Sequence, residues 1–387
     1  MKKDYSLLLF GIFSSVYIIN LVKNLKRVNP QINIYYWGLE NSNKDITDIE
    51  YLNCFTDYCL YKQELKFTKY PVLRTIESII KFRKEFKKFA ESKHFDIVNI
   101  HYTQFIYVFI LDLIKRCSSM MVLSPWGKDV RCSNKKESIL LRILYNSANY
   151  VTGDEESEFT KMCLQKFKFS PRKLYSHVWF GSEIVDYTLE NKTIIDTKEA
   201  KKRLGLTESY VITCGYNADP DIQHLSFIEA VNKAKNELPS NLLLLFPLTY
   251  GGTLEYRKEL KNKVKEYNLR AVYYEDFLEV SQLFLVRQAT DMYIHILKGD
   301  AGGASLKEYL LCDKKTIIGG WLRYSDLGKG GPNPYFISDK IEDLDKTIVK
   351  VYHSQPIKYS SSTEEILSKK GWKTAIRTWD EFYSKIV

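Results

Sequence analysis

The chain has 387 residues, of which 45% are apolar, and carries a formal net charge of +10 at pH 7. This length exceeds what one hydrophobic core normally serves, so we expect two folded domains. No run approaches the ~20 apolar residues that cross a bilayer, which argues against a transmembrane protein. The early apolar run at 6–13 lacks a following small-residue cleavage site, so we interpret it as a first strand rather than a signal peptide.

Cysteine usage and charge narrow the class of protein further. Seven cysteines, an odd number without a Cys-x-x-Cys pair, predict reduced thiols in a cytoplasmic protein. No cluster of His, Cys, Asp and Glu has the spacing of metal ligands, so we expect no metal. The positive charge indicates an acidic partner, but no nucleic-acid-binding motif accompanies it. We therefore favour an anionic membrane or a phosphorylated substrate over nucleic acid.

Apolar, β-prone runs alternate with amphipathic segments along the first half of the chain. The runs lie at 5–11, 32–38, 95–101, 120–127, 150–153 and 174–181. Such alternation predicts βαβ units and a parallel sheet, in which ligands bind beyond the carboxyl ends of the strands. Functional residues should therefore cluster just after strands.

A strongly basic helix is predicted between Arg74 and Lys93. Its apolar side would consist of Ile76, Ile79, Ile80, Phe86 and Phe89, and its basic side includes Lys84, Lys87 and Lys88. One interpretation is a crossover helix with a solvated basic face. The other is a contact with anionic lipid headgroups, where each basic residue is worth on the order of 1 kcal/mol. The two interpretations are compatible.

Three turns after predicted strands supply candidate residues of the first domain. Gly11 ends the first strand, and His101 ends the strand at 95–101. A neutral imidazole there could orient an acceptor hydroxyl or accept its proton. The third turn contains Trp126, Gly127, Lys128 and Asp129. Structural alternatives are a tight turn at Gly11, a carbonyl-bonded His101 and an Asp129 that caps a helix start.

We predict an N-terminal domain over 1–190, a polar linker at about 186–202 and a second domain over 203–355. A terminal helix is predicted over 360–387, and its aromatic stripe consists of Trp372, Ile376, Trp379 and Phe382. We expect this helix to pack on the first domain, although the stripe would also suit the core of the second.

Two turns of the second domain carry further candidates. The first follows the strand that opens the second sheet and contains Gly215, Asn217 and His224. The other follows the strand beginning at residue 242 and contains Tyr250. Ordinary aromatic packing in a loop is the structural alternative for Tyr250.

A glycine-rich turn follows the apolar run at 291–297 and leads into a helix. It begins with Asp300, and the residues after it include Gly302, Gly303, Ala304 and Ser305. Unpaired N–H groups and the dipole at a helix N-terminus favour bound phosphate. Glu308, eight positions after Asp300, places a second carboxylate inside the helix. A plain strand-turn-helix is the alternative.

The spacing of Asp300 and Glu308, with Gly303 between them, resembles the acidic-x7-acidic signature of retaining glycosyltransferases with the GT-B fold, such as family 4. Asp300 replaces the usual glutamate. The strand that ends in His101 and the turn from Trp126 to Asp129 also resemble segments of this family. The resemblance implies an α/β fold of two facing Rossmann-like domains with parallel sheets, the first binding the acceptor and the second the nucleotide sugar.

The turns at Gly215 and Tyr250 resemble those of N-acetylfucosaminyltransferases that extend a lipid-linked glycan. The arginine and lysine that grip the donor diphosphate in family 4 are absent from the first of these turns. Arg323, Lys329 and Lys298 are the candidates to replace them.

These resemblances imply transfer of a sugar from a nucleoside diphosphate sugar to a glycan or a polyprenyl-phosphate-linked acceptor. The process would be surface polysaccharide biosynthesis at the inner face of the cell membrane, with no cofactor or metal. Glu308 would be an exposed carboxylate that holds the ribose, and Asp300 would hold the sugar hydroxyls. His101 or Asp129 would face the acceptor.

The resemblance of the Asp300 and Glu308 spacing to the signature of the retaining family implies retention rather than inversion. Alternatives to this function are a sugar nucleotide epimerase of the same fold and a catalytically degenerate protein that binds glycan or membrane.

Overall fold

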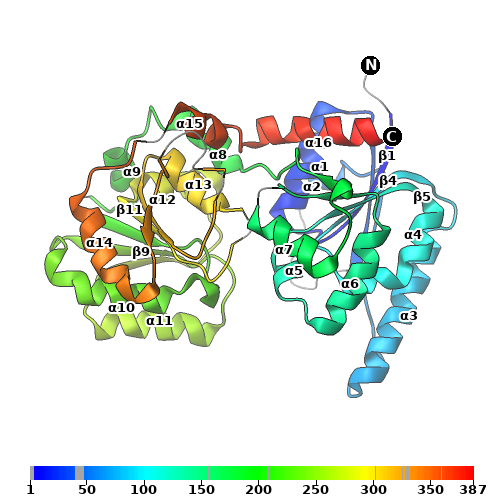
Figure 1. Cartoon of the computed structure of the whole chain (residues 1–387), viewed down its shortest axis with the longest axis horizontal. Coiled ribbons are helices and arrows are strands. Elements are labelled where there is room, and N and C mark those ends of the chain that lie inside the picture. The colour runs from blue at the N-terminus through cyan, green and yellow to red at the C-terminus, as the bar shows by residue number, and fades with distance from the viewer. Residues whose placement is uncertain are drawn as a thin grey trace. The chain divides into compact units, whose positions relative to one another are not determined.

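The computed structural model describes residues 4–39, 48–155, 157–207, 209–300, 302–324, 326–327, 332–358 and 360–387. The chain forms two compact units, one of Met1–Gly181 with Trp372–Val387 and one of Ser182–Gly371. Each unit has a parallel sheet between helices (Figure 1). The predicted α/β class with two parallel sheets is therefore confirmed. None of the described helices has both the length and the apolar character needed to cross a membrane.

The first unit is built on a seven-stranded sheet in the order β3-β2-β1-β4-β5-β6-β7. Its strands are β1 Ser6–Phe10, β2 Asn33–Leu39, β3 Asp57–Tyr61, β4 Phe95–His101, β5 Ser118–Ser124, β6 Tyr150–Thr152 and β7 Leu174–Tyr175. Neighbouring strands all pair in parallel. The central strands are buried on both faces, which explains their continuous apolar sequences.

Helices cover both faces of this sheet. They are α1 Val16–Val28, α2 Ile49–Leu52, α3 Pro71–Ala90, η1 Phe105–Ile110, α4 Leu111–Cys117, α5 Lys128–Arg131, α6 Lys135–Ser147, α7 Glu158–Phe167, η2 Pro171–Lys173 and α16 Trp372–Ile386. One apolar core lies under α1, α2 and α16. A second core on the opposite face lies under α3, α4, α6, α7 and η1.

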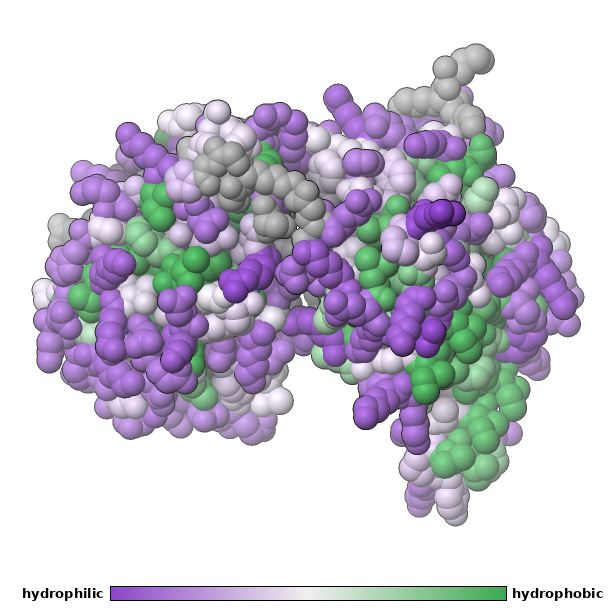
Figure 2. Space-filling view, in the orientation of Figure 1, coloured by the Kyte–Doolittle hydropathy of each residue, from purple (hydrophilic) through white to green (hydrophobic). Residues whose placement is uncertain are grey.

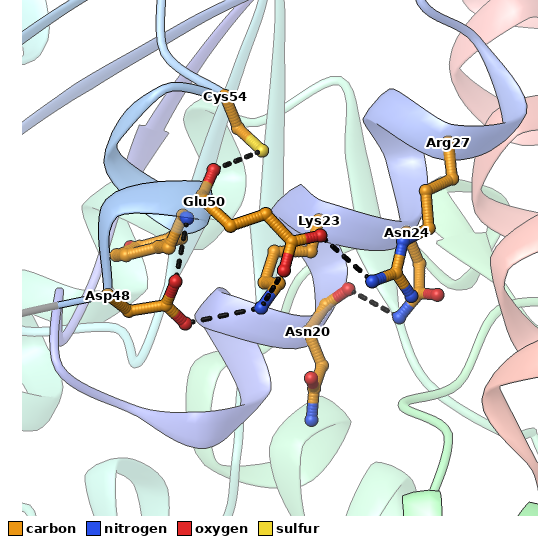
Figure 3. Close-up of polar contacts among 8 residues, drawn as sticks. Asn20, Lys23, Asn24, Arg27, Asp48, Glu50 and Cys54 are labelled. Atoms are coloured by element: carbon orange, nitrogen blue, oxygen red, sulfur yellow. Dashed lines mark hydrogen bonds and ion pairs between the residues drawn. The ribbon is translucent and has the colours of Figure 1, made fainter.

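Ion pairs hold α2 against α1 (Figure 3). Lys23 Nζ lies 2.6 Å from the Glu50 carboxylate and 3.2 Å from that of Asp48. Arg27 adds a contact of 2.9 Å to Glu50, and Cys54 Sγ donates to the Glu50 carbonyl. Asp48 also caps α2 by accepting from the Tyr51 N–H. These ion pairs and hydrogen bonds stabilise α2, whose four residues form few hydrogen bonds within the helix itself.

The second unit has a six-stranded sheet in the order β10-β9-β8-β11-β12-β13. Its strands are β8 Tyr210–Cys214, β9 Leu242–Pro247, β10 Ala271–Tyr274, β11 Met292–His295, β12 Lys315–Gly319 and β13 Phe336–Ser338. Its helices are α8 Glu183–Asn191, α9 Thr197–Arg203, η3 Pro220–Ile222, α10 His224–Ala234, η4 Lys235–Glu237, α11 Leu254–Glu266, α12 Val280–Ala289, α13 Ala304–Leu311, η5 Ile341–Asp343, α14 Leu344–His353 and α15 Ser361–Ser368. All neighbouring strands are parallel.

The boundaries between the units differ from those that the sequence suggested. The first segment of the first unit ends at Gly181, and the stretch expected as a linker at 186–202 contributes to α8 and α9 of the second unit. The expected helix over 360–387 is two helices, α15 and α16, which belong to different units. The break falls at Gly371, where a Cβ would lie 2.1 Å from Asp186 Oδ1. A side chain at this position would have to displace the Asp186 carboxylate.

The terminal helix α16 lies in the core of the first unit. Its aromatic stripe is buried, including Trp379 and Phe382. Asn99 in β4 donates its amide N–H to the Tyr383 hydroxyl at 2.7 Å and accepts from Ser124 Oγ at 3.0 Å. This buried polar chain joins α16 to the middle of the sheet.

Replacing Tyr383 by phenylalanine should leave the buried Asn99 amide without its acceptor. We expect a loss of about 1–3 kcal/mol in the free energy of unfolding. Thermal unfolding followed by circular dichroism measures it, with the exposed Tyr58→Phe as the matched control. An unchanged melting temperature for Tyr383→Phe would show that this hydrogen bond does not contribute to stability.

Candidate functional site

The glycine-rich turn lies between the end of β11 and the start of α13. Gly303 has φ +62°, and a Cβ there would lie 2.7 Å from the Tyr324 ring. This position therefore requires glycine for both its backbone angle and its close approach. The first turn of α13 contains no acidic residue. Its outward N–H groups and dipole make the turn suitable for an anion.

Asp300 belongs to a buried hydrogen-bond network at this turn. Its Oδ2 accepts from the Tyr324 hydroxyl at 2.7 Å and lies 3.2 Å from His295 Nε2. The Tyr293 hydroxyl lies 3.1 Å from His295 Nδ1 and 2.9 Å from Ser305 Oγ. Burial, reinforced by the Asp300 charge, holds the pKa of Tyr324 far above its ordinary value, so its hydroxyl stays a donor. The network fixes Asp300 beside the start of α13.

Glu308 differs from the exposed carboxylate that we expected. It is 7% exposed, and its Oε2 accepts from Arg287 Nη2 at 3.2 Å and Nε at 3.3 Å. Its Oε1 accepts from Ser182 Oγ at 2.8 Å. Three of about four lone-pair positions of the carboxylate are thus engaged. Burial opposes the charge of Arg287, but Tyr309 and Glu308 outweigh it and keep the pKa of the guanidinium above its ordinary value.

The turn after β8 is held to the turn after β9. Gly215 has φ +69°, and a Cβ there would lie 2.4 Å from the Ile222 side chain. The Ala218 N–H donates to the Tyr250 carbonyl at 2.7 Å. Asn217 accepts from the Asp219 N–H at 2.8 Å. The two turns therefore form one rigid edge at the carboxyl ends of β8 and β9.

Tyr250 connects this edge to Glu308. The residue is 53% exposed, yet burial around its hydroxyl raises the pKa of Tyr250. A hydrogen bond with the Asn217 side chain lowers that pKa, while the charge of Glu308 raises it. Asn217 and Glu308 thus both influence the Tyr250 hydroxyl. The second unit brings most of its predicted residues to one end of its sheet.

His224 lies behind this edge rather than on it. It is fully buried, and its Nδ1 lies 3.1 Å from the Tyr256 hydroxyl. Burial lowers the pKa of His224 to about 4, so the ring is neutral near pH 7. A Cβ on Gly215 would lie 3.2 Å from His224 Nε2. His224 therefore supports the turn at Gly215 from beneath.

Two of the three candidate cations for a diphosphate lie within the described residues. Lys298 has a side chain that is 63% exposed, 3.8 Å from Asp221. Arg323 donates to the Gly320 carbonyl at 2.5 Å. Lys329 lies outside the described residues. Lys298, directly before the glycine-rich turn, is the better placed of the two.

The predicted residues of the first unit gather at the carboxyl ends of β1, β4 and β5. His101 is fully buried among Trp126, Phe180 and Trp379, with ring centroids 5.4–6.2 Å away. Neither ring nitrogen has a hydrogen-bond partner among the described residues. Burial lowers the pKa of His101 to about 3, which keeps the ring neutral. A Cβ on Gly11 would lie 3.2 Å from His101, so this glycine allows the close approach.

Asp129 stabilises its own turn. Its carboxylate accepts from the Gly127 N–H at 2.7 Å, the Trp126 N–H at 3.1 Å and the Thr103 N–H and hydroxyl at 2.8 and 3.0 Å. Burial raises the pKa of Asp129, and these donors partly oppose the rise. Asp129 is therefore not an open base, and it is not the helix cap either, because the N-cap of α5 is Gly127, which has no side-chain cap hydrogen bond. Lys128, the next residue towards the N-terminus, is exposed.

Sequence comparison with known proteins finds little similarity to this chain. No family model matches the chain. A curated relative, the uncharacterized glycosyltransferase MJ1069 of Methanocaldococcus jannaschii, is 21% identical over 168 residues. The match covers 41% of this chain and only 42% of that protein.

Solved structures align along almost the whole chain. HepE of Anabaena, solved with UDP and glucose, is 14% identical with a TM-score of 0.68, covering 98% of this chain and 100% of HepE. Sucrose-phosphate synthase of Thermosynechococcus elongatus is 12% identical with a TM-score of 0.72, covering 98% of both chains. The fold is that of GT-B glycosyltransferases, as predicted.

Sequence reasoning missed Arg287, His295 and Tyr324. His295 carried a usable signal, because a histidine at the carboxyl end of a buried strand is placed like His101. Arg287 stands in an otherwise apolar stretch of α12, which suggests a buried partner. Tyr324 gave no local signal, since it lies 24 residues after Asp300.

Removing the charge of Glu308 should destabilise the second unit. In Glu308→Gln the buried Arg287 loses its counter-charge, and we expect a loss of about 3 kcal/mol in the free energy of unfolding. The double variant Arg287→Met/Glu308→Leu should recover most of it, because no charge is left unpaired. Urea unfolding measures the stability of both variants. The control is Glu199→Gln, which breaks the more exposed ion pair with Arg203 and should change the free energy of unfolding little. A double variant that is less stable than Glu308→Gln would contradict this account.

Acid should destabilise the first unit through His101. The unfolded chain binds a proton near the ordinary pKa of 6.5, whereas the folded state resists it until about pH 3. This contribution is therefore complete above pH 6.5 and is lost as the pH falls, at about 1.4 kcal/mol per pH unit. His101→Phe should flatten the pH dependence of urea unfolding between pH 7 and 5. The exposed His94→Gln should not, and equal slopes for His101→Phe and the unchanged protein would refute the assignment.

Proposed function

We propose that the chain is a glycosyltransferase that takes its sugar from a nucleoside diphosphate sugar. The observation that carries this proposal is the glycine-rich turn between β11 and α13, flanked by Asp300 and Glu308 in a GT-B fold. HepE, which shares the fold, is solved with UDP and glucose. The anion-favouring turn and the two carboxylates supply the groups that a charged sugar donor requires.

In this proposal each part of the donor has its own partner. The diphosphate binds the N–H groups at the start of α13, beside the exposed Lys298. Glu308, oriented by Arg287 and Ser182, uses its remaining lone pair for the ribose. Asp300, held by Tyr324 and His295, receives the sugar hydroxyls. The edge formed by Gly215, Asn217 and Tyr250 closes the pocket.

The chemistry requires stabilisation of a departing diphosphate, for which preorganised donors are well suited. We propose metal-independent transfer with retention of configuration. His101 is enclosed by aromatic rings, and Asp129 already accepts four hydrogen bonds from Thr103 and its own turn. Because neither is presented as an open base, the leaving phosphate takes the proton of the acceptor. Trp126 and Lys128 then line the acceptor side, and the buried His101 packs against Trp126.

We propose a glycan or a polyprenyl-phosphate-linked glycan as the acceptor, in surface polysaccharide biosynthesis at the cytoplasmic face of the membrane. The support is the basic surface of α3 in the unit that carries the acceptor-side residues. Five of the seven cysteines are buried and all seven are free thiols, which fits a reducing compartment.

One observation favours a second candidate, a degenerate protein that binds nucleotide or glycan without turnover. The carboxylate of Glu308 is already engaged by an arginine and a serine. If the pair serves only stability, nucleotide binding would not depend on it.

Calorimetric titration with UDP, GDP, TDP and CMP tests the proposal. We expect one nucleoside diphosphate to bind, with stabilisation of roughly 2.7 kcal/mol at 100 times its dissociation constant. The double variant Arg287→Met/Glu308→Leu should stay folded and lose at least tenfold in affinity. Asp300→Asn should keep nucleotide affinity but lose turnover of the sugar nucleotide.

The exposed Glu342→Gln serves as the matched control for these titrations. The absence of any nucleotide binding would overturn the proposed function. Full affinity in the double variant would remove Glu308 from the donor site and favour the degenerate candidate.

A further inference from the structure

The N-terminal end of α3 has an apolar surface that no described part of the first unit covers. The crossover-helix interpretation would place Ile76 and Ile80 against the sheet, but they are 49% and 61% exposed. Val72 and Leu73 are exposed as well, whereas Phe82 and Phe86 are the residues that α3 buries. The last turns of α3 pack on the sheet, and its first turns extend beyond the rest of the unit (Figure 1).

The exposed apolar residues lie on one side of the helix. At 100° per residue, Val72, Leu73, Ile76 and Ile80 fall within an arc of about 100°. Figure 2 shows this as a green area at the lower end of the first unit. We call the end of the helix that carries these four residues the α3 tip. A scattered exposed isoleucine needs no explanation, but a contiguous apolar side does.

Charge follows the apolar residues along the same side of the helix. Lys84 and Lys87 lie one to two turns beyond Ile80, about 6–10 Å further along the axis. Lys66, Lys69 and Arg74 surround the tip itself. The only acid on α3 before residue 85 is Glu77, and it pairs with Lys81 at 2.9 Å. The α3 tip therefore presents apolar residues at its end and net positive charge around and above them.

Hydrogen bonds hold the loop that precedes α3 against the tip. The Glu77 carboxylate accepts from the backbone N–H groups of Lys66 and Phe67 at 2.8 and 3.0 Å. Gln63 donates to the Ser78 hydroxyl at 2.6 Å and to its carbonyl at 3.2 Å. The preceding loop is thereby bound along the helix, and it contributes the exposed rings of Phe67 and Tyr70. Such a surface can bind without the entropic cost of first becoming ordered.

We propose that the α3 tip inserts into the headgroup and acyl boundary of an anionic membrane. Apolar side chains enter the first 5–10 Å of an interface while lysines remain with the acidic headgroups, and this order matches the order along α3. A protein partner would need acidic groups set around an apolar pocket, whereas an anionic lipid surface offers both features everywhere. The inference deepens the proposed function by naming the membrane partner of the acceptor-binding unit, but its test does not require turnover.

Vesicle co-sedimentation of the whole chain tests the insertion. With phosphatidylglycerol vesicles we expect binding that exceeds binding to phosphatidylcholine vesicles and that keeps a fraction at 0.5 M NaCl. Val72→Ser/Ile80→Ser should weaken binding by about tenfold or more at both salt concentrations. Lys84→Glu/Lys87→Glu should weaken it mainly at low salt, because salt already screens those charges.

The matched control removes similar apolar surface elsewhere. Ile194 and Leu254 are 75% and 72% exposed in the second unit, and Ile194→Ser/Leu254→Ser should bind vesicles as the unchanged protein does. Equal loss in both double variants would overturn the proposal. The proposal would also be overturned if the unchanged protein self-associates and Val72→Ser/Ile80→Ser makes it monomeric. In that case the α3 tip would bind a second copy of the chain rather than a membrane.

Nucleotide titration of the same variants separates the two proposals. Val72→Ser/Ile80→Ser should retain full nucleotide affinity, because neither residue belongs to the second unit. Vesicle binding without nucleotide binding would overturn the proposed function alone, and nucleotide binding without vesicle binding would overturn the insertion alone.

Discussion

One buried ion pair sets the position of α13 in the second unit. Arg287 and Glu308 are 4% and 7% exposed, and removing both from water costs several kcal/mol that only close, hydrogen-bonded pairing can offset. The pair ties α12 to α13 and, through Ser182, to the residue that precedes α8. Because α13 is thereby fixed, its N-terminus stays next to the end of β11. A plain strand-turn-helix would need no such buried charges, which is why we connect the pair with binding.

The first unit encloses a polar ring, that of His101, in apolar surroundings. His101 is neutral because burial disfavours its charged form, and the rings of Trp126, Phe180 and Trp379 surround it. Asp129 holds the turn that positions Trp126. Both units thus use carboxylates to position other groups near the candidate sites.

Much of the fold followed from local pattern. Alternating apolar runs predicted parallel sheets, because strands buried on both faces must be apolar throughout. Most of the candidate residues follow strands, and all carboxyl ends of a parallel sheet share one edge, but His224 lies beneath that edge. The burial of Glu308 could not be predicted in this way, because its partner Arg287 is 21 residues away in a separate helix. The same limit applies to Asp300 and Tyr324. Periodicity likewise could not show that Ile76 and Ile80 face outward, because an apolar stripe looks the same against a core and against solvent.

A structure of the chain with its nucleoside diphosphate bound would test the central claim most directly. The account predicts diphosphate oxygens within hydrogen-bond distance of the N–H groups of Gly303, Ala304 and Ser305, with a ribose hydroxyl on Glu308. A nucleotide that leaves the start of α13 unoccupied, with Glu308 contacting only Arg287 and Ser182, would contradict it.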